Sequence, residues 1–239
     1  HSNCRISSNQ TRWYPLAQLL SKVVIKSEDM VTYAFIDASN LFYGGEKSLG
    51  WKIDYKKFAE YLRNKYGVSK MYYFGGVELH GYAYDYLKNS TVPVKEVERY
   101  LSRLIKTEGR KYDEARLILA SKHLQIIKFY LKLESFGYDL FLKPVKLYHE
   151  SNDTTQRKAN CDVEMAFYLM RDISKFNKVI FLSGDGDFLP ILKYLKDINK
   201  EVIVLARGER TAKEIRQFAG NNFRDFNYLR ELLKYEEKK

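Results

Sequence analysis

The sequence predicts an α/β domain with a doubly wound, mainly parallel sheet over about residues 30 to 235. Short apolar runs rich in β-branched and aromatic residues alternate with longer segments of helical periodicity. Several of these runs stop abruptly at Asp, Ser, Asn or Gly, as buried strands do where they open into loops. The 239 residues are 45% hydrophobic and contain no internal repeat or low-complexity linker, which suits one large core.

The first part of the chain predicts a strand, a helix and a second strand. Residues 31–36 (VTYAFI) are apolar and rich in β-formers, and they stop at the polar sequence DASN. Residues 55–65 (YKKFAEYLRNK) have the apolar spacing of a helix, and residues 70–74 (KMYYF) predict a strand that Gly75 and Gly76 close. This order is that of a βαβ unit, in which the two strands lie parallel.

The middle of the chain predicts a helical insertion at about residues 94–135. Residues 94–107 and 113–135 have helix-forming composition, and apolar side chains recur at spacings of three, four and seven. Residues 138–145 (YDLFLKPV) predict a third strand. Pro144 near its end indicates an edge strand or a termination, because proline cannot donate to a neighbouring strand.

The last part of the chain continues the alternation. Residues 151–160 (SNDTTQRKAN) are the most loop-like stretch and lead directly into Asp162. Two further strands are expected, at residues 178–183 and 201–206, and four helices, at residues 160–172, 188–197, 211–219 and 229–235.

Composition indicates a polyanionic partner. The chain carries 41 Lys and Arg against 30 Asp and Glu, a formal net charge of +11, which favours nucleic acid. Cys4 and Cys161 lack the spacing of a zinc site or a disulfide framework, so a reducing, cytoplasmic location is expected. No apolar run approaches the roughly 20 residues that span a bilayer, so we expect a soluble protein without a membrane partner.

Four aspartates flank the predicted strands. Asp37 follows the first strand, Asp185 and Asp187 follow the strand at residues 178–183, and Asp162 opens the helix before it. Loops at the carboxyl ends of parallel strands line a crevice where the strand order reverses, so we expect these carboxylates to meet there. Crowded carboxylates need a compensating cation, and oxygen ligands without His or Cys favour Mg²⁺ or Mn²⁺.

Each of these residues also has a structural alternative. Asp187 and Asp162 would serve as N-caps of the helices that they precede, and Asp185 as a turn or cap residue. Asn40 either orients a substrate or closes its turn. The sequence alone leaves these alternatives open.

Three sequence blocks resemble a known family. Residues 35–40 (FIDASN), 158–166 (KANCDVEMA) and 183–188 (SGDGDF), in this order, resemble the signature blocks of the NYN domain, the LabA-like branch of the PIN-like ribonucleases. The resemblance covers most of residues 31 to 228. It implies a PIN-like three-layer α/β sandwich with a central, mainly parallel sheet, and an acidic metal-dependent centre that cleaves single-stranded or structured RNA.

The resemblance also implies roles for individual residues. Asp37, Asp162 and Asp185 match the core acidic positions that bind metal, with Asp187 and Asn40 in support. Residues 30–239 are then an NYN/PIN-like nuclease domain that carries the helical insertion. Residues 1–29, before Met30, are expected to be an N-terminal extension or an added segment that is not native.

The function expected from these observations is that of a metal-dependent endoribonuclease. Asp37, Asp162 and Asp185 would bind Mg²⁺ or Mn²⁺, which activates a water to attack the phosphodiester, with Asp187 as an outer ligand or water-orienting base. Phosphates would be held by Asn40 and by basic residues near the sheet edge, namely Lys143, Lys146, Arg157, Lys158, Arg207 and Arg210.

Two alternatives to this function stay open. The first is an RNA-binding or regulatory domain with an inactive centre, because Tyr168 stands where many members of the family carry another acidic residue. The second is a protein-interaction module that recruits a partner, or a second copy of the chain, through the helical insertion.

Overall fold

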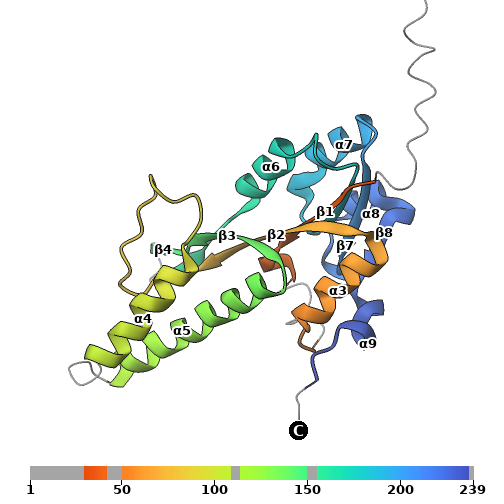
Figure 1. Ribbon diagram of the computed structural model, residues 1–239. Coiled ribbons are helices and arrows are strands. Elements are labelled where there is room, and N and C mark those ends of the chain that lie inside the picture. Colours follow the sequence, from red (N-terminus) through yellow and green to blue (C-terminus); the bar gives the residue numbers. More distant parts are fainter. Residues whose placement is uncertain (1–29, 42–49, 109–113, 150–154, 237–239) are drawn as a thin grey trace, which may run out of the picture. The chain divides into compact units, whose positions relative to one another are not determined.

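The computed structural model describes residues 30–41, 50–108, 114–149 and 155–236 (Figure 1). Val31–Lys239 form one structural unit, within which all elements named below lie. The N-terminal segment expected at residues 1–29 lies outside the described residues.

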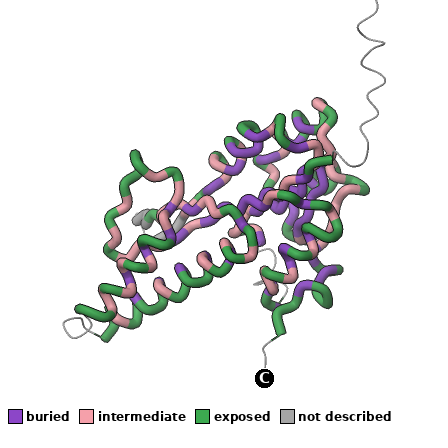
Figure 2. The backbone as a smooth tube through the Cα atoms, in the orientation of Figure 1, coloured by how far each residue is buried: buried purple, intermediate pink, exposed green. Residues whose placement is uncertain are grey.

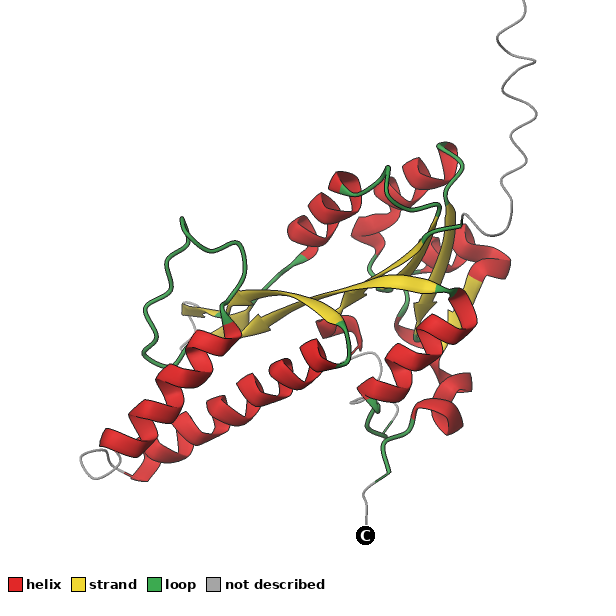
Figure 3. Ribbon diagram, viewed as in Figure 1, coloured by secondary structure: helices red, strands yellow, loops and turns green. Residues whose placement is uncertain are grey.

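A six-stranded parallel sheet runs through this unit in the order β3-β2-β1-β6-β7-β8 (Figure 3). Its strands are β1 (Thr32–Asp37), β2 (Val68–Val77), β3 (Tyr138–Pro144), β6 (Lys178–Leu182), β7 (Glu201–Ala206) and β8 (Phe223–Asp225). Every neighbouring pair is parallel. The chain adds β2 and β3 on one side of β1 and the later strands on the other, so the strand order reverses between β1 and β6. The five expected strands are confirmed, and Pro144 ends an edge strand.

Helices cover both faces of the sheet (Figure 1). One face packs against α3 (Tyr55–Tyr66), α4 (Val94–Glu108), α5 (Glu114–Ser135) and α9 (Arg230–Leu233), and the other against α6 (Asp162–Arg171), α7 (Leu189–Asp197) and α8 (Lys213–Ala219). Because side chains alternate along a strand, Ala34 and Ile36 of β1 enter the first core cluster and Phe35 enters the second. Buried residues therefore concentrate along the sheet (Figure 2), which confirms the three-layer α/β sandwich.

The helical insertion is confirmed as the pair α4 and α5. Apolar and aromatic side chains at spacings of three and four, among them Ile127, Tyr130 and Leu133, form the buried stripe of α5. The Tyr130 hydroxyl donates a 2.8 Å hydrogen bond to the Gly76 carbonyl oxygen, which fixes α5 against β2. The residues between these positions on α5 remain at the surface, and Phe129 is 38% exposed.

The start of α3 is fixed by a capping interaction. The Asp54 side chain accepts hydrogen bonds of 3.0 Å from the backbone N–H groups of Lys56 and Lys57, and thereby satisfies two donors of the first turn. At the other end, Gly67 has a φ of 65°, a left-handed conformation that glycine adopts without strain. The cap fixes the start of α3, where Asp54, Tyr55 and Lys56 line the pocket described below.

Two local expectations are wrong, and one short strand was not expected. Gly75 and Gly76 do not close β2, which continues through both glycines to Val77 and pairs with β3. The loop-like stretch before Asp162 contains β5 (Thr155–Lys158), which forms an antiparallel hairpin with β4 (Lys146–His149). The sixth strand, β8, has only three residues, too few for a readable alternation. Short 3₁₀ turns supply the remaining connections, at η4 (Gly186–Phe188), η5 (Gly208–Arg210), η6 (Gly220–Asn222) and η7 (Phe226–Leu229).

Candidate functional site

Asp37 and Asp185 lie beside each other at the point where the strand order reverses. Asp37 is the last residue of β1, and Asp185 follows the neighbouring strand β6. The buried Ser183 links them, because its hydroxyl donates a 3.2 Å hydrogen bond to Asp37 Oδ2 and accepts one of 3.3 Å from the Asp185 N–H. A crevice at such a switch point is where open α/β sheets bind their ligands.

The turn after β1 fixes the other oxygen of Asp37. Its Oδ1 accepts hydrogen bonds from the Ser39 N–H at 2.9 Å, the Ser39 hydroxyl at 2.7 Å and the Asn40 N–H at 3.2 Å. Asn40 therefore closes the turn through its backbone. The described lining of the pocket reported below includes Ser39 but not Asn40.

Asp162, the first residue of α6, comes to the site of Asp37 and Asp185 from a segment that packs on β2. The segment before it lies directly on that strand, with Ala159 against Gly76 and the Cys161 thiol 3.4 Å from the Gly75 carbonyl oxygen. The Asn160 side-chain oxygen accepts a 2.7 Å hydrogen bond from the Asp162 N–H, which orders the start of α6. Burial raises the pKa of the Cys161 thiol to about 12, so this cysteine remains protonated and unreactive at neutral pH.

The carboxylates interact electrostatically. Burial is the main cause that raises the pKa of Asp162, and the charges of Asp37, Asp185 and Asp187 raise it further, while the Asn160 hydrogen bond opposes the shift. The four aspartates predicted from the sequence thus lie close enough together for three of them to disfavour the charge on the fourth.

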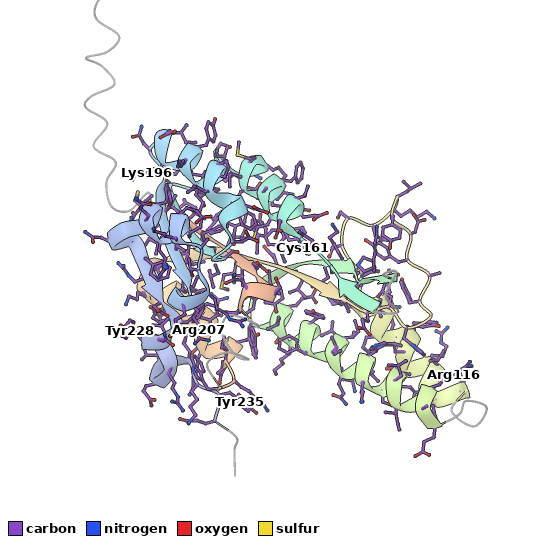
Figure 4. All side chains as sticks on the ribbon, turned by 180° about the vertical axis from the view of Figure 1, so that it is seen from behind. Arg116, Cys161, Lys196, Arg207, Tyr228 and Tyr235 are labelled. Carbon is purple, nitrogen blue, oxygen red and sulfur yellow. The ribbon has the colours of Figure 1, made fainter. Side chains whose placement is uncertain are left out.

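Asp37, Asp162 and Asp185 line one pocket of about 1200 Å³. Residues from β1, β2, the start of α3, α5 and the segment before α6 form its walls, and Figure 4 labels two of them, Cys161 and Tyr235. The volume exceeds the 300–1,000 Å³ that is typical of a small-molecule site, which suits a segment of a polymer. Asp187 is outside the described lining, although its charge reaches Asp162.

The donor set fits a hard cation. Among the described residues, no three Asp, Glu, His or Cys side chains are spaced to hold one metal ion together. Mg²⁺ commonly keeps several waters and uses only one or two protein carboxylates, so this spacing is compatible with it. One or two of Asp37, Asp162 and Asp185 would bind such an ion directly and the others through its waters, and its charge would relieve the repulsion that adds to burial in raising the pKa of Asp162.

Of the capping roles considered for Asp185, Asp187 and Asp162, the structure shows only that of Asp185. Asp185 does cap η4, because its Oδ1 accepts a 3.0 Å hydrogen bond from the Asp187 N–H. Asp187 does not take the N-cap position of α7, which belongs to Phe188. Asp162 is the first residue of α6, after Cys161 at the N-cap, so the alternative that it caps its own helix is wrong.

Of the predicted phosphate-binding residues, Lys143, Lys146, Arg207 and Arg210 are not among the described residues that line the pocket. Lys143 pairs with Glu164 at 2.7 Å and donates to the Asn160 carbonyl oxygen at 3.1 Å. Arg207, labelled in Figure 4, pairs with Glu209 at 2.6 Å, while Lys146 and Arg210 are exposed. Arg157 and Lys158 are the last two residues of β5.

Tyr168 lies in the core. It is 8% exposed, packs against Phe141 at a ring-centroid distance of 3.8 Å, and has the Arg171 guanidinium 4.0 Å from its ring. It is absent from the described lining of the pocket.

Sequence reasoning missed several residues of the pocket. Ser39 lines the pocket, and Ser183 contacts Asp37 from outside the described lining. They belong to the DASN and SGDGDF sequences, where their positions beside the aspartates are a usable signal. Lys52, Lys56 and Lys132 also line the pocket, but they come from distant segments with no local signature.

Within the described ranges, no helix is both long and apolar enough to cross a membrane.

Comparison with known proteins agrees with this geometry. The chain is 22% identical over 206 residues to the low amplitude and bright protein LabA of Synechococcus elongatus, and the match covers 85% of this chain and 88% of that protein. A crystal structure of a protein of unknown function from Vibrio parahaemolyticus RIMD 2210633 has a similar fold, with a TM-score of 0.51 and 16% identity over 81% of this chain and 91% of the other.

A match to a family sequence model shows the family of this chain. The sequence model of the NYN domain matches residues 87–227, more than half of the 239 residues. The matched range contains Asp162, Asp185 and Asp187 and begins after Asp37. The chain therefore belongs to the NYN domain family.

Proposed function

We propose that this protein is a metal-dependent endoribonuclease. The observation that supports it best is the convergence of Asp37, Asp162 and Asp185 from three distant segments on one pocket, where the pKa of Asp162 is raised by burial and by its neighbours. Perturbed carboxylates in a cleft are typical of functional sites. Membership in the NYN family, a branch of the PIN-like nucleases, supports a nuclease-type activity.

The roles follow from the geometry. One or two of Asp37, Asp162 and Asp185 would bind the cation directly and the others through its waters, and Ser183 keeps Asp37 oriented through its hydrogen bond. A bound Mg²⁺ or Mn²⁺ would supply an acidified water and would stabilise charge on the phosphodiester. Asp187 is exposed and lies within electrostatic reach of Asp162, so it is the residue that orients the attacking water or accepts its proton.

The net charge of +11 supports a nucleic-acid substrate. The carboxylates of Asp37, Asp162 and Asp185 would repel a phosphate at the centre, so a bound cation would lessen this repulsion as well as assist the chemistry. Basic residues farther from the centre position the rest of the strand.

The test is cleavage of end-labelled single-stranded and hairpin RNA with Mn²⁺, with Mg²⁺ or with chelator. Three proteins are compared: wild type, Asp185→Asn and Asp197→Asn. The amide oxygen of the Asp185→Asn variant would still accept the hydrogen bond from the Asp187 N–H, so the fold should persist. The lost charge should lower the cleavage rate by orders of magnitude. Asp197, an exposed residue at the end of α7, is the matched control, and its variant should cleave like wild type.

Two outcomes would contradict the proposal. The first is cleavage by Asp185→Asn at the wild-type rate, which would leave Asp185 as a capping residue alone. The second is a wild-type protein that binds RNA but cleaves none with either metal. That result would identify an RNA-binding or regulatory domain with an inactive centre.

A further inference from the structure

The pocket extends well beyond the carboxylates. Its other half lies along the start of α3, the face of α5 and the C-terminal segment, and we call it the helical half. It is lined by Lys52, Asp54, Lys56, Ile126, Phe129, Lys132 and Tyr235, together with neighbouring apolar residues. Tyr235 belongs here because its N–H donates a 2.9 Å hydrogen bond to the Lys52 carbonyl oxygen.

Large apolar side chains are exposed in the helical half. Ile126, Phe129 and Tyr235 are 42%, 38% and 48% exposed, although each lines a pocket wall. The Phe129 ring packs edge-to-face with Tyr55 at 5.2 Å, which holds it in place without covering it. Exposed apolar side chains gathered in a concave surface indicate a binding site.

The charge of the helical half is opposite to that of the acidic half. Lys52, Lys56 and Lys132 contribute three cations against the carboxylate of Asp54, which caps α3, and Lys132 lies 5.4 Å from the Phe136 ring centre. Carboxylates line the other half of the same pocket. A ligand that fills both halves must therefore present negative charge and flat apolar surface beside the lysines, and a cation-bridged anion beside the aspartates.

We propose that the helical half binds the nucleotides next to the scissile phosphate of a single-stranded nucleic acid. A base stacks on Phe129, and the flanking phosphates pair with Lys132, Lys56 and Lys52. This inference rests on the proposed function, because it takes the acidic half as the place of cleavage. The helical insertion then forms a wall of the substrate site through α5.

The chemistry of the site favours an unpaired strand. In a duplex the bases are already stacked on each other, so they cannot stack on Phe129 without first unpairing. Alternating aromatic surface and lysines is the arrangement with which proteins bind single strands without reading their sequence. The helical half thus gives the protein a preference for unpaired segments, whatever their sequence.

The test is binding in chelator, where cleavage does not occur. Fluorescein-labelled uridine 12-mers are titrated in three forms: single-stranded, annealed to a complementary strand, and lacking all bases. Wild type should bind the single strand most tightly. Phe129→Ala should weaken that binding by roughly 5- to 100-fold, because stacking contributes about 1–3 kcal/mol per base. The same substitution should leave binding of the base-free strand unchanged.

Matched variants separate stacking from folding. Phe129→Tyr keeps a ring and should bind like wild type, whereas Phe129→Leu keeps apolar bulk against Tyr55 and should bind weakly. Phe167→Ala removes an exposed ring from α6, outside the described pocket lining, and should leave binding of the single strand unchanged.

Lys132→Ala should weaken binding of the single-stranded and the base-free probe alike. Its control is Lys193→Ala, which removes an exposed lysine from α7. Thermal melting of each variant checks the fold.

The proposal is overturned if Phe129→Leu binds the single strand as tightly as wild type. It is also overturned if duplex and single strand bind equally, or if wild type binds neither. Cleavage is measured separately with metal, so the two proposals can fail independently. A protein that cleaves RNA but binds it independently of Phe129 refutes only the helical half as a base site. A protein that binds through Phe129 but never cleaves refutes only the nuclease activity.

Discussion

Gly76 of β2 and Ala159 lie in direct contact: a Cβ built on Gly76 would fall 2.3 Å from the Cβ of Ala159. Gly75 is almost as close to the turn after β1, because its Cβ would lie 3.0 Å from that of Ala38. Ala38 follows Asp37, and Ala159 comes shortly before Asp162. Two glycines in one strand therefore allow the backbones that carry two of the carboxylates to approach β2 from both sides.

Gly76→Ala should lower cleavage more than stability. The new methyl group must push Ala159 away and with it the start of α6, so Asp162 moves from its place. A displacement of about 1 Å at a catalytic group costs roughly 100-fold in rate. Cleavage of single-stranded RNA and thermal melting are measured side by side. The double variant Gly76→Ala/Ala159→Gly restores the space and should recover most of the activity. Full activity in the single variant would show that this contact does not position the site.

Asp162→Asn should stabilise the protein in chelator. Burial and the neighbouring carboxylates raise the pKa of Asp162, so its charged form is disfavoured in the folded state and its removal relieves that cost. We expect a rise of about 1–3 °C in melting temperature for a domain of this size. Mn²⁺ should raise the melting temperature of wild type more than that of the variant, because a bound ligand stabilises the folded state. Asp197→Asn should resemble wild type in both conditions. A lower melting temperature for Asp162→Asn in chelator would contradict the repulsion.

Asp37 and Asp185 could be predicted from the sequence because each follows a strand that has its own apolar signature, whereas Asp162 begins a helix. Once β1 and β6 are recognised as parallel strands, Asp37 and Asp185 must lie at the same edge of the sheet. The glycines of β2 were misread as a strand end, since glycine is uncommon inside strands. Their actual role depends on Ala159, which is distant in sequence, and no local pattern reveals such a contact.

The helical half of the pocket could not be predicted for a similar reason. Lys56 and Lys132 have the helical surface positions of ordinary solvated lysines, and Phe129 fits the apolar periodicity of α5 equally well as a core residue. Only the packing of α5 and the C-terminal segment beside the start of α3 places them in one pocket. The strand β5 was missed because its four residues, TQRK, are all polar, and the pairing with β4 overrides their weak propensity.

Replacing both Arg157 and Lys158 by alanine should weaken the salt dependence of RNA binding. Each neutralised phosphate of a single strand contributes roughly 0.7 to the slope of log affinity against log salt concentration. Loss of two phosphate contacts should therefore reduce the slope by roughly 1.4. The measurement is a titration of labelled RNA at several salt concentrations in chelator. The double variant Lys193→Ala/Lys196→Ala on α7 removes the same charge elsewhere, and it should keep the wild-type slope. An unchanged slope for Arg157→Ala/Lys158→Ala would exclude β5 from the RNA surface.

A network of ion pairs centres on the buried Asp172 at the end of α6, away from the described pocket lining. The Asp172 side chain is 0% exposed and accepts hydrogen bonds from the Arg171 guanidinium, the Lys175 ammonium at 2.8 Å and the Tyr72 hydroxyl at 2.5 Å. The Arg171 hydrogen bonds, followed by those of Lys175 and Tyr72, hold the pKa of Asp172 well below its usual range against the opposing effect of burial. The network joins α6 to β2, and so it supports the fold without touching the site.

Asp172→Asn should lower stability at neutral pH and flatten its acid dependence. The pKa of Asp172 is lower in the folded than in the unfolded protein, where it is about 3.9, so the carboxylate stabilises the fold fully above that value. This stabilisation is lost as the pH falls through the folded pKa. We expect the variant to lose about 1.5–3 kcal/mol of unfolding free energy at pH 7, the usual contribution of hydrogen bonds to a charged group. The difference from wild type should shrink below about pH 4. Urea unfolding at several pH values measures this difference in unfolding free energy.

The control is Asp139→Asn, which breaks the exposed 3.5 Å ion pair between Asp139 and Lys70. It should lower the unfolding free energy by less than about 1 kcal/mol at any pH. Equal losses in the two variants would mean that Asp172 contributes no more than a surface ion pair.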